Sequence, residues 1–169
     1  CPITTHLPIK AVAKKINKKI IIEKVFIINK FYKKRFGFQP RIAILGLNPH
    51  CESVDKFNED EKITKPAVTI LKKMKYKVKG PFSADTAFLK NNIKKFDVII
   101  GMYHDQVLTP VKTLFEYDAI NITLGLPFVR ISPDHGPNEK MIGKNISNPL
   151  SLIRAIEFLD KNWLKQRKV

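Results

Sequence analysis

The sequence lacks the features that define several large protein classes. Its two cysteines, Cys1 and Cys51, form neither a CxxC pair nor a disulfide framework, which fits a reducing compartment better than an oxidising one. No apolar run is long enough to cross a membrane, and there is no internal repeat, low-complexity linker or signal-peptide core. We therefore expect a cytoplasmic protein with no membrane partner.

Acidic residues are also scarce. The chain has 15 Asp and Glu against 31 Lys and Arg, a formal net charge of +16. Such an excess can indicate a nucleic-acid or anionic-membrane partner, but these lysines are scattered along the chain, with no nucleic-acid motif and no interleaved aromatic residues. The charge therefore predicts a solvated basic surface that favours acidic or phosphorylated small molecules. No nucleic-acid partner is expected, and a basic polyanion-binding module is a distant alternative.

What is present is an ordinary globular composition. The 169 residues are 44% hydrophobic and 27% charged, enough for one domain with a real core. The sequence starts without methionine, as if in the middle of a strand, and we expect a single α/β fragment over residues 1–169 of a longer two-domain protein.

Periodicity gives a coarse order of elements. Buried strands are expected at 41–47, 97–102 and 119–124, a short strand at 76–80, a turn at 81–86, helices at 8–16, 19–35, 59–75 and 150–165, and a loop at 132–149. Strands that alternate with helices predict a parallel α/β sheet. The runs 97–102 and 119–124 are expected to lie side by side and to face one crevice.

Three of the four histidines, His6, His50 and His104, each follow a predicted strand. Strand ends of a parallel sheet meet at one edge, so these imidazoles could converge on a divalent metal. Each could equally be a lone surface or capping histidine, and the spacing does not decide. Lys112 and Arg130 are likewise solvated charges or anion ligands, because each adjoins an apolar segment.

Six short motifs resemble one known family. They are TTHLP (4–8), GLNPH (46–50), GP with ADT (80–81 and 84–86), MYHDQ (102–106), NITLGLP (121–127) and DHG (134–136). In this order they resemble the C-terminal half of the 4-hydroxythreonine-4-phosphate dehydrogenase family of vitamin B6 biosynthesis. The resemblance implies a three-layer α/β fold with a parallel or mixed sheet of the isocitrate/isopropylmalate dehydrogenase type, present here as a partial chain.

The resemblance also implies roles for individual residues. A divalent metal (Zn, Mg or Co) would be held by His6, His50 and His104 and shared across a homodimer interface. The phosphorylated substrate would be held by Lys112, Asn121 and Arg130, and NAD or NADP by His135, Gly136 and Asn148. Asp105 is a candidate catalytic base, although it could instead orient His104.

The implied reaction is oxidation of 4-phosphooxy-L-threonine at its secondary hydroxyl, with hydride transfer to the nicotinamide, followed by decarboxylation. A related metal-dependent dehydrogenase for another hydroxy acid or a dihydrodiol is the alternative, and the chain on its own is expected to be inactive. Some positions depart from the family pattern. Glu52 and Ser53 follow His50 in a glycine-free loop, Pro137 replaces a hydroxyl residue, and Lys140 replaces an acid in the cofactor loop.

Overall fold

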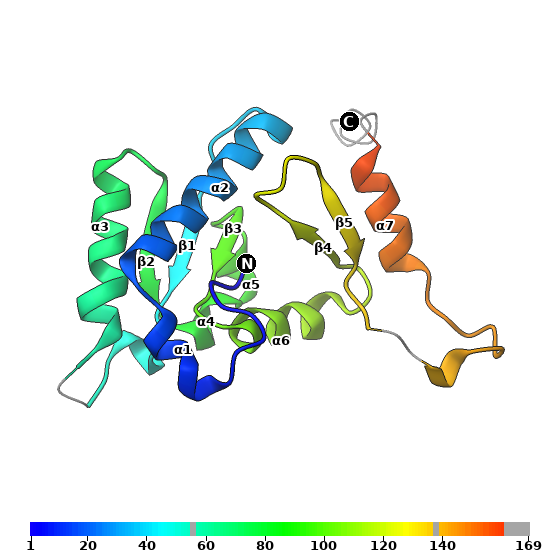
Figure 1. Ribbon diagram of the computed structural model, residues 1–169, viewed down its shortest axis with the longest axis horizontal. Coiled ribbons are helices and arrows are strands. Elements are labelled where there is room, and N and C mark those ends of the chain that lie inside the picture. Colours follow the sequence, from blue (N-terminus) through cyan, green and yellow to red (C-terminus); the bar gives the residue numbers. More distant parts are fainter. Residues whose placement is uncertain (55–56, 137–138, 161–169) are drawn as a thin grey trace. The chain divides into compact units, whose positions relative to one another are not determined.

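The computed structural model describes residues 1–54, 57–136 and 139–160, which fall into two compact units that divide after Pro110 (Figure 1). Each unit is described by itself. Within the described residues, no helix has both the length and the apolar character needed to cross a bilayer.

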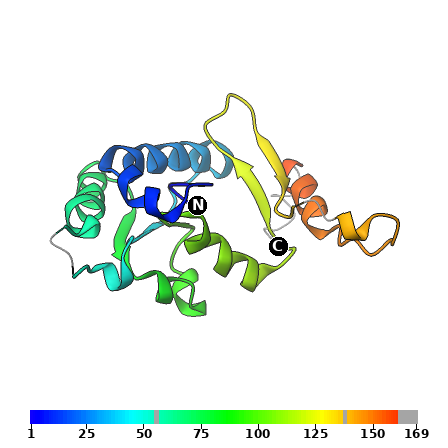
Figure 2. The ribbon, with the colours of Figure 1, turned by 60° about the horizontal axis from the view of Figure 1, so that its bottom comes forward.

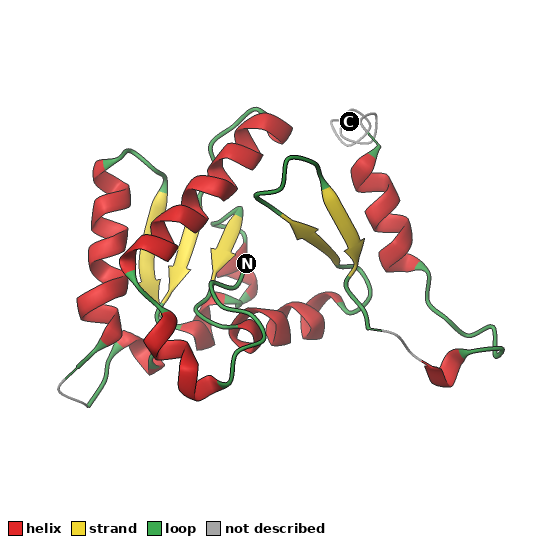
Figure 3. Ribbon diagram, viewed as in Figure 1, coloured by secondary structure: helices red, strands yellow, loops and turns green. Residues whose placement is uncertain are grey.

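A parallel sheet forms the centre of the first unit. Its strands are β1 (Ile42–Leu45), β2 (Val78–Phe82) and β3 (Val98–Ile100), in the order β2-β1-β3 (Figure 3). All four residues of β1 are buried and apolar, as expected for a central parallel strand covered on both faces. Residues 1–4 continue the sheet beside β3, because Pro2 forms a parallel bridge with Gly101 and the Ile3 N–H donates to the Gly101 carbonyl at 2.8 Å.

Helices cover both faces of this sheet (Figure 2). They are α1 (Ile9–Lys15), α2 (Lys18–Phe36), α3 (Lys65–Lys73), α4 (Ala84–Ala87), α5 (Lys90–Ile93) and α6 (His104–Phe115). Asn17 caps α2 by accepting the Ile20 N–H at 3.0 Å, and Gly37 ends it at φ 78°, a left-handed conformation that glycine adopts without steric cost. On one face of the sheet, Leu45 packs with Val107 of α6.

The starts of β1 and β3 are joined by an ion pair. Arg41 approaches Asp97 in a bidentate geometry, with Nη2–Oδ1 at 2.9 Å and Nε–Oδ2 at 3.1 Å, and its backbone N–H donates to Oδ2 at 2.7 Å. The Arg41 guanidinium, hydrogen-bonded to the carboxylate, lowers the pKa of Asp97. The ionised form of Asp97 is therefore favoured in the folded state.

We expect Asp97→Asn to lower the free energy of unfolding at pH 7 by about 1–2 kcal/mol, because it weakens a charge-assisted contact that is only partly screened. Since folding depresses this pKa, the stabilisation is complete above the unfolded-state value of about 3.9 and is lost as pH falls through the folded value. Urea unfolding at pH 7 and at about pH 3 checks this. Glu23→Gln is the control, since Glu23 forms only an exposed 3.9 Å pair with Lys19; equal losses in both variants at pH 7 would contradict the prediction.

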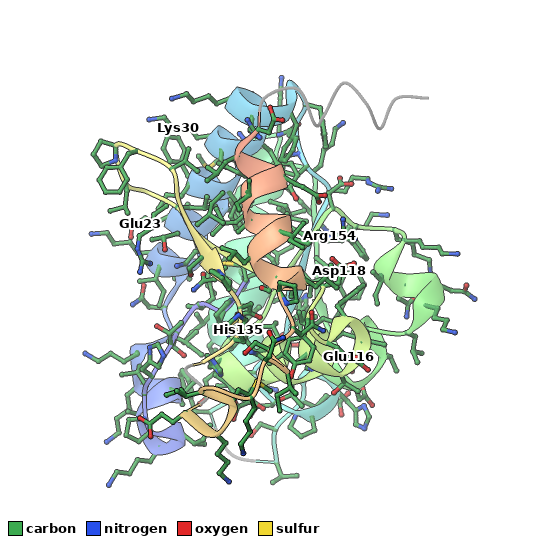
Figure 4. All side chains as sticks on the ribbon, turned by 90° about the vertical axis from the view of Figure 1, so that its right-hand side faces the viewer. Glu23, Lys30, Glu116, Asp118, His135 and Arg154 are labelled. Carbon is green, nitrogen blue, oxygen red and sulfur yellow. The ribbon has the colours of Figure 1, made fainter. Side chains whose placement is uncertain are left out.

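The second unit is an antiparallel hairpin with a helix. Strand β4 (Ile120–Thr123) pairs with β5 (Arg130–Pro133), and α7 (Leu150–Leu159) contacts both strands. The buried Ser151 hydroxyl accepts the Asp134 N–H at 2.9 Å and donates to the Ala119 carbonyl. Arg154 reaches Asp118 at 2.7 Å (Figure 4). These bonds fix α7 against both strands at the open end of the hairpin.

The structure confirms the α/β class, the parallel sheet and most of the predicted elements. The assignment to the isocitrate/isopropylmalate type stays a prediction. The region 59–75 begins with a π-helical turn, η2 (Asp60–Thr64), before α3. The predicted turn at 81–86 is wrong, because Pro81 and Phe82 complete β2 and α4 follows directly. The predicted loop 132–149 contains the end of β5 and a 3-10 turn, η3 (Glu139–Met141).

The runs 97–102 and 119–124, which were expected to lie side by side, are not neighbours in a sheet. Among the described strands, β3 pairs with β1, and β4 pairs with β5 in a separate antiparallel sheet. Alternation of strands and helices does not encode which strands pair, so the two apolar runs looked equivalent. The last part of the predicted helix 150–165 lies outside the described residues.

Candidate active site

Two of the three strand-end histidines line one cavity in the first unit. The cavity has a volume of about 310 Å³ and is lined by Thr4, His6, Leu7, Pro8, Ile9, Tyr103, His104 and Asp105. The His6 and His104 ring centroids are 5.8 Å apart. The structure therefore brings these two predicted metal ligands together.

Backbone pairing explains why residues so distant in sequence meet here. The buried Thr4 donates its hydroxyl to the Met102 carbonyl at 2.8 Å and its N–H to the same oxygen at 3.2 Å. His6 follows two residues later in a left-handed conformation with φ 51°, and His104 begins α6. The extended segment beside β3 thus delivers His6 to the strand end that delivers His104.

A carboxylate contacts the second of these imidazoles. His104 Nδ1 lies 2.7 Å from Asp105 Oδ1, so Nε2 is the nitrogen left to face another group. This contact has the geometry needed for the orienting role that the sequence left open for Asp105. The Asp105 side chain is largely exposed.

His50 stands in a 3-10 turn, η1 (Pro49–Cys51), just after β1, with φ 54°. Within residues 1–54, 57–136 and 139–160, no three His, Cys, Asp or Glu side chains form a group that could hold a metal ion. The structure thus pairs His6 with His104 without gathering the full predicted triad. Beside His50, burial and then the nearby Asp60 charge raise the pKa of the Cys51 thiol, which keeps that thiol protonated at neutral pH.

The second unit carries the predicted substrate residues. Asn121 pairs with Ser132 and Thr123 with Arg130 in the hairpin register. Alternate residues of a strand share a face, so these four side chains form one polar face, while Ile120, Ile122, Ile131 and Pro133 form the other. Arg130 Nη1 donates to Thr123 Oγ1 at 2.9 Å. Asn121 and Arg130 are both exposed.

A separate cavity of about 200 Å³ lies within the second unit, lined by Lys112, Glu116, Tyr117, Asp134, His135 and Ser151. Lys112 Nζ donates to the Asp134 carbonyl at 2.5 Å and lies 3.7 Å from its carboxylate. The predicted phosphate-binding lysine and the predicted cofactor-binding His135 therefore share one cavity.

The remaining cofactor-loop positions are spread along the second unit. Gly136 is exposed, and a Cβ added there would meet nothing within 4 Å. The Asn148 side chain accepts the Leu150 N–H at 3.0 Å at the start of α7. Lys140 is exposed on η3. Pro137 lies outside the described residues.

A family comparison decides the relationship. The sequence model of the family described as "Pyridoxal phosphate biosynthetic protein PdxA" matches residues 1–159. The chain belongs to this family.

Individual PdxA-family proteins agree in sequence and in structure. The chain is 50% identical over 157 residues to the 4-hydroxythreonine-4-phosphate dehydrogenase of Sulfurihydrogenibium sp. (strain YO3AOP1), covering 92% of this chain and 48% of the relative. It is 43% identical over 157 residues to that of Xanthobacter autotrophicus, covering 92% and 45%. The crystal structure of the Klebsiella pneumoniae enzyme superposes with a TM-score of 0.77 at 33% identity, covering 92% of this chain and 48% of that one. The chain thus spans about half the length of the curated relatives it matches.

Two polar residues beside the predicted PdxA-family ligands had no role assigned from sequence. Asp60 accepts hydrogen bonds from the turn that leads to His50, and Gln106 lies two residues after His104 with both ends of its amide bonded. In the sequence, Asp60 is an acidic residue near the predicted start of a helix, which is a common position for an acid and therefore indicated no special role. The one available signal for Gln106 was its place in the MYHDQ motif.

Proposed function

We propose that this chain is the C-terminal half of a 4-hydroxythreonine-4-phosphate dehydrogenase. The reaction is metal-dependent, NAD(P)-linked oxidation of 4-phosphooxy-L-threonine to 2-amino-3-oxo-4-phosphooxybutanoate, followed by loss of CO₂. The observation that carries the proposal is the shared cavity of His6 and His104 with Asp105, in a chain 50% identical to a relative of that name.

The donor set suits a divalent metal. Two imidazoles line one cavity, and one is oriented by a carboxylate in the manner common to metal-binding histidines. His6 and His104 would hold the ion together with His50, and the proposed homodimer would complete the site from two subunits. When bound, the ion lowers the pKa of the substrate hydroxyl and polarises the developing carbonyl.

Two roles are open to Asp105, orientation of His104 and proton acceptance, and its contact with His104 favours the first. Its carboxylate holds the Nδ1 side of His104 at 2.7 Å, which fixes the tautomer that presents Nε2 to the cavity. Its exposed second oxygen could accept the hydroxyl proton as a general base. We assign Asp105 the orienting role first, with proton acceptance as the further proposal.

The phosphate would be held by the basic residues of the second unit. Arg130 offers a planar, permanently charged donor set on the polar hairpin face, and Asn121 on the same face can accept or donate a hydrogen bond to orient the substrate. Lys112 lines the cavity of the same unit. Of the two acidic residues that line this cavity, Glu116 and Asp134, Asp134 has its carboxylate within 4 Å of the Lys112 ammonium. An incoming phosphate can compete for this lysine with charge-assisted hydrogen bonds.

The cofactor would bind along His135, Gly136 and Asn148. His135 lines the second cavity, and the lack of a side chain at Gly136 leaves the backbone open to a ligand. Bound NAD(P) supplies the hydride acceptor. Lys140 adds a positive charge where the family pattern has an acid, which favours an anionic group such as the 2′-phosphate of NADP.

The proposal includes a homodimer in the cytoplasm. Both cysteines are free thiols, which suits a reducing compartment.

The substrate assignment is tested with Lys112→Ala and Arg130→Ala in a completed enzyme, meaning this chain joined to the N-terminal half of the Sulfurihydrogenibium relative. Each variant should raise KM for 4-phosphooxy-L-threonine by about 10- to 100-fold, since each removes a charge-assisted contact of about 1.5–3 kcal/mol. KM for unphosphorylated 4-hydroxythreonine should change much less. Steady-state NAD(P)⁺ reduction measures both.

Lys90→Ala is the matched control, because Lys90 is an exposed lysine on α5 in the other unit. It should leave both KM values unchanged. Equal losses on the two substrates in the Lys112 and Arg130 variants would instead favour a dehydrogenase for an unphosphorylated hydroxy acid or dihydrodiol.

A further inference from the structure

The turn that presents His50 is held by a buried carboxylate. Asp60 is 1% exposed. Its Oδ1 accepts the Leu47 N–H at 2.8 Å, and its Oδ2 accepts the Asn48 N–H at 2.9 Å. A buried carboxylate that accepts two consecutive backbone N–H groups fixes the backbone between them, because leaving either partner unpaired is costly.

A helix residue ties the same turn to the end of β3. Gln106 of α6 donates Nε2–H to the Gly46 carbonyl at 2.8 Å, and its Oε1 accepts the Met102 N–H at 2.6 Å. One side-chain amide thus bridges the backbone just past β1 and just past β3. The first of these backbones leads to His50, and the second leads to His104.

Two glycines make room for this arrangement. A Cβ added at Gly46 would lie 2.7 Å from Cys51 Sγ and 3.1 Å from the Asp60 carboxyl carbon, and one at Gly101 would lie 2.5 Å from Val107 Cγ1 and 2.9 Å from Gln106 Oε1. All four distances are shorter than ordinary carbon contacts. The close packing just past each strand end, which includes the approach of Asp60 and Gln106, therefore depends on the missing side chain at Gly46 and at Gly101.

We propose that Asp60 and Gln106 are positioning residues for the metal ligands. Asp60 sets the conformation of the turn that presents His50, and Gln106 fixes that turn against the one that presents His104. Neither side chain touches the substrate or the ion. The inference rests on the proposed metal role of the histidines and deepens it, because it names the groups that set the spacing between two ligand-bearing turns.

The test uses Gln106→Glu and Asp60→Asn in the completed enzyme. Gln106→Glu keeps the acceptor for Met102 but places a carboxylate against the Gly46 carbonyl. Asp60→Asn keeps one acceptor oxygen but places an NH₂ group opposite a backbone N–H, so that two donors face each other. Gln39→Glu is the matched control, because the Gln39 amide donates to the Lys75 carbonyl at 3.1 Å before the start of β1, at the other end of that strand from Gly46.

Two measurements separate positioning from a general loss of structure. Hydrogen exchange of the Leu47 and Asn48 amides should quicken in Asp60→Asn and stay unchanged in Gln39→Glu. Calorimetric titration with Co²⁺ should show affinity about 10- to 100-fold weaker in Gln106→Glu and Asp60→Asn, the usual effect of removing a group that orients a metal ligand. Gln106→Glu should have a lower thermal midpoint than Gln39→Glu but still unfold in one cooperative transition, which keeps the test valid if Asp60→Asn folds poorly.

A double-mutant cycle with His50→Ala gives the decisive result. If Gln106 acts through His50, Gln106→Glu should weaken Co²⁺ binding in the parent and have little further effect once His50 is gone. A full, additive loss in the His50→Ala background would overturn the positioning role while leaving the metal site standing. Co²⁺ affinity unchanged by His50→Ala alone would overturn the proposed metal site itself, and the positioning role with it.

Discussion

Replacing His104 by alanine in the completed enzyme is expected to lower kcat/KM by at least ~10³-fold, which corresponds to about 4 kcal/mol of lost transition-state stabilisation. His104 shares its cavity with His6 and contacts Asp105, so its removal deletes a proposed ligand and leaves the carboxylate without its partner. The fold should survive, because the ring is exposed at the start of α6 rather than buried in the core. Activity and bound metal, the latter by elemental analysis, check this.

His135→Ala is the control for this experiment. It removes the one histidine that lines the second-unit cavity, so metal content should be retained while KM for NAD(P)⁺ rises. Full metal content and full activity in His104→Ala would refute the assignment of His104 as a ligand.

The second large effect concerns the 169-residue chain made alone, which we expect to show no turnover and to associate abnormally. The hairpin of β4 and β5 has only two strands, and such a sheet is marginal without further strands or cover. Large apolar side chains stand exposed on the hairpin and on α7, including Phe128 at 63% and Ile156 at 60%. Exposed apolar surface and unpaired strand edges both promote aggregation, and the chain spans about half of its relatives.

Light scattering and an assay of metal-dependent NAD(P)⁺ reduction with 4-phosphooxy-L-threonine measure both parts of this prediction. Adding the N-terminal half of the relative in trans should reduce the association and restore some activity, because it supplies the missing cover and the rest of the site. A monodisperse and active monomer would contradict both the truncation argument and the shared-site argument.

The sequence predicted the strands β1, β2 and β3 and the helices α1, α2 and α3 of the first unit because their signals are local, but it did not predict α4, α5 or α6. The apolar run 41–47 and the helix expected at 19–35 each depend on a few neighbouring residues, and they formed as β1 (Ile42–Leu45) and α2 (Lys18–Phe36). Strand pairing depends on contacts that periodicity does not report. For this reason the sequence did not predict that the run 119–124 pairs with β5.

The site also combines features that local sequence signals predict with features that depend on tertiary packing. Strand-end positions brought His6 and His104 into one cavity, as expected from the geometry of a parallel sheet. The hydrogen bonds of Asp60 and Gln106 could not be foreseen, because burial and amide orientation are set by tertiary packing rather than by residue type. The ligand roles of His6, His50 and His104, the role of Asp105, and the substrate and cofactor roles in the second unit remain predictions, supported by resemblance and by local geometry.

The pairing of residues 1–4 with β3 affects how the cavity forms over time. The Thr4–Met102 hydrogen bond joins residues 98 apart in sequence, and closing a flexible loop of that length costs about 4 kcal/mol of chain entropy. Contacts this distant form after the local ones that offset such a cost. On the ribosome, a nascent chain would hold the His6 segment without its partner until β3 and the first turn of α6 had emerged. The cavity is therefore a late product of folding, and its appearance would report that the first unit is complete.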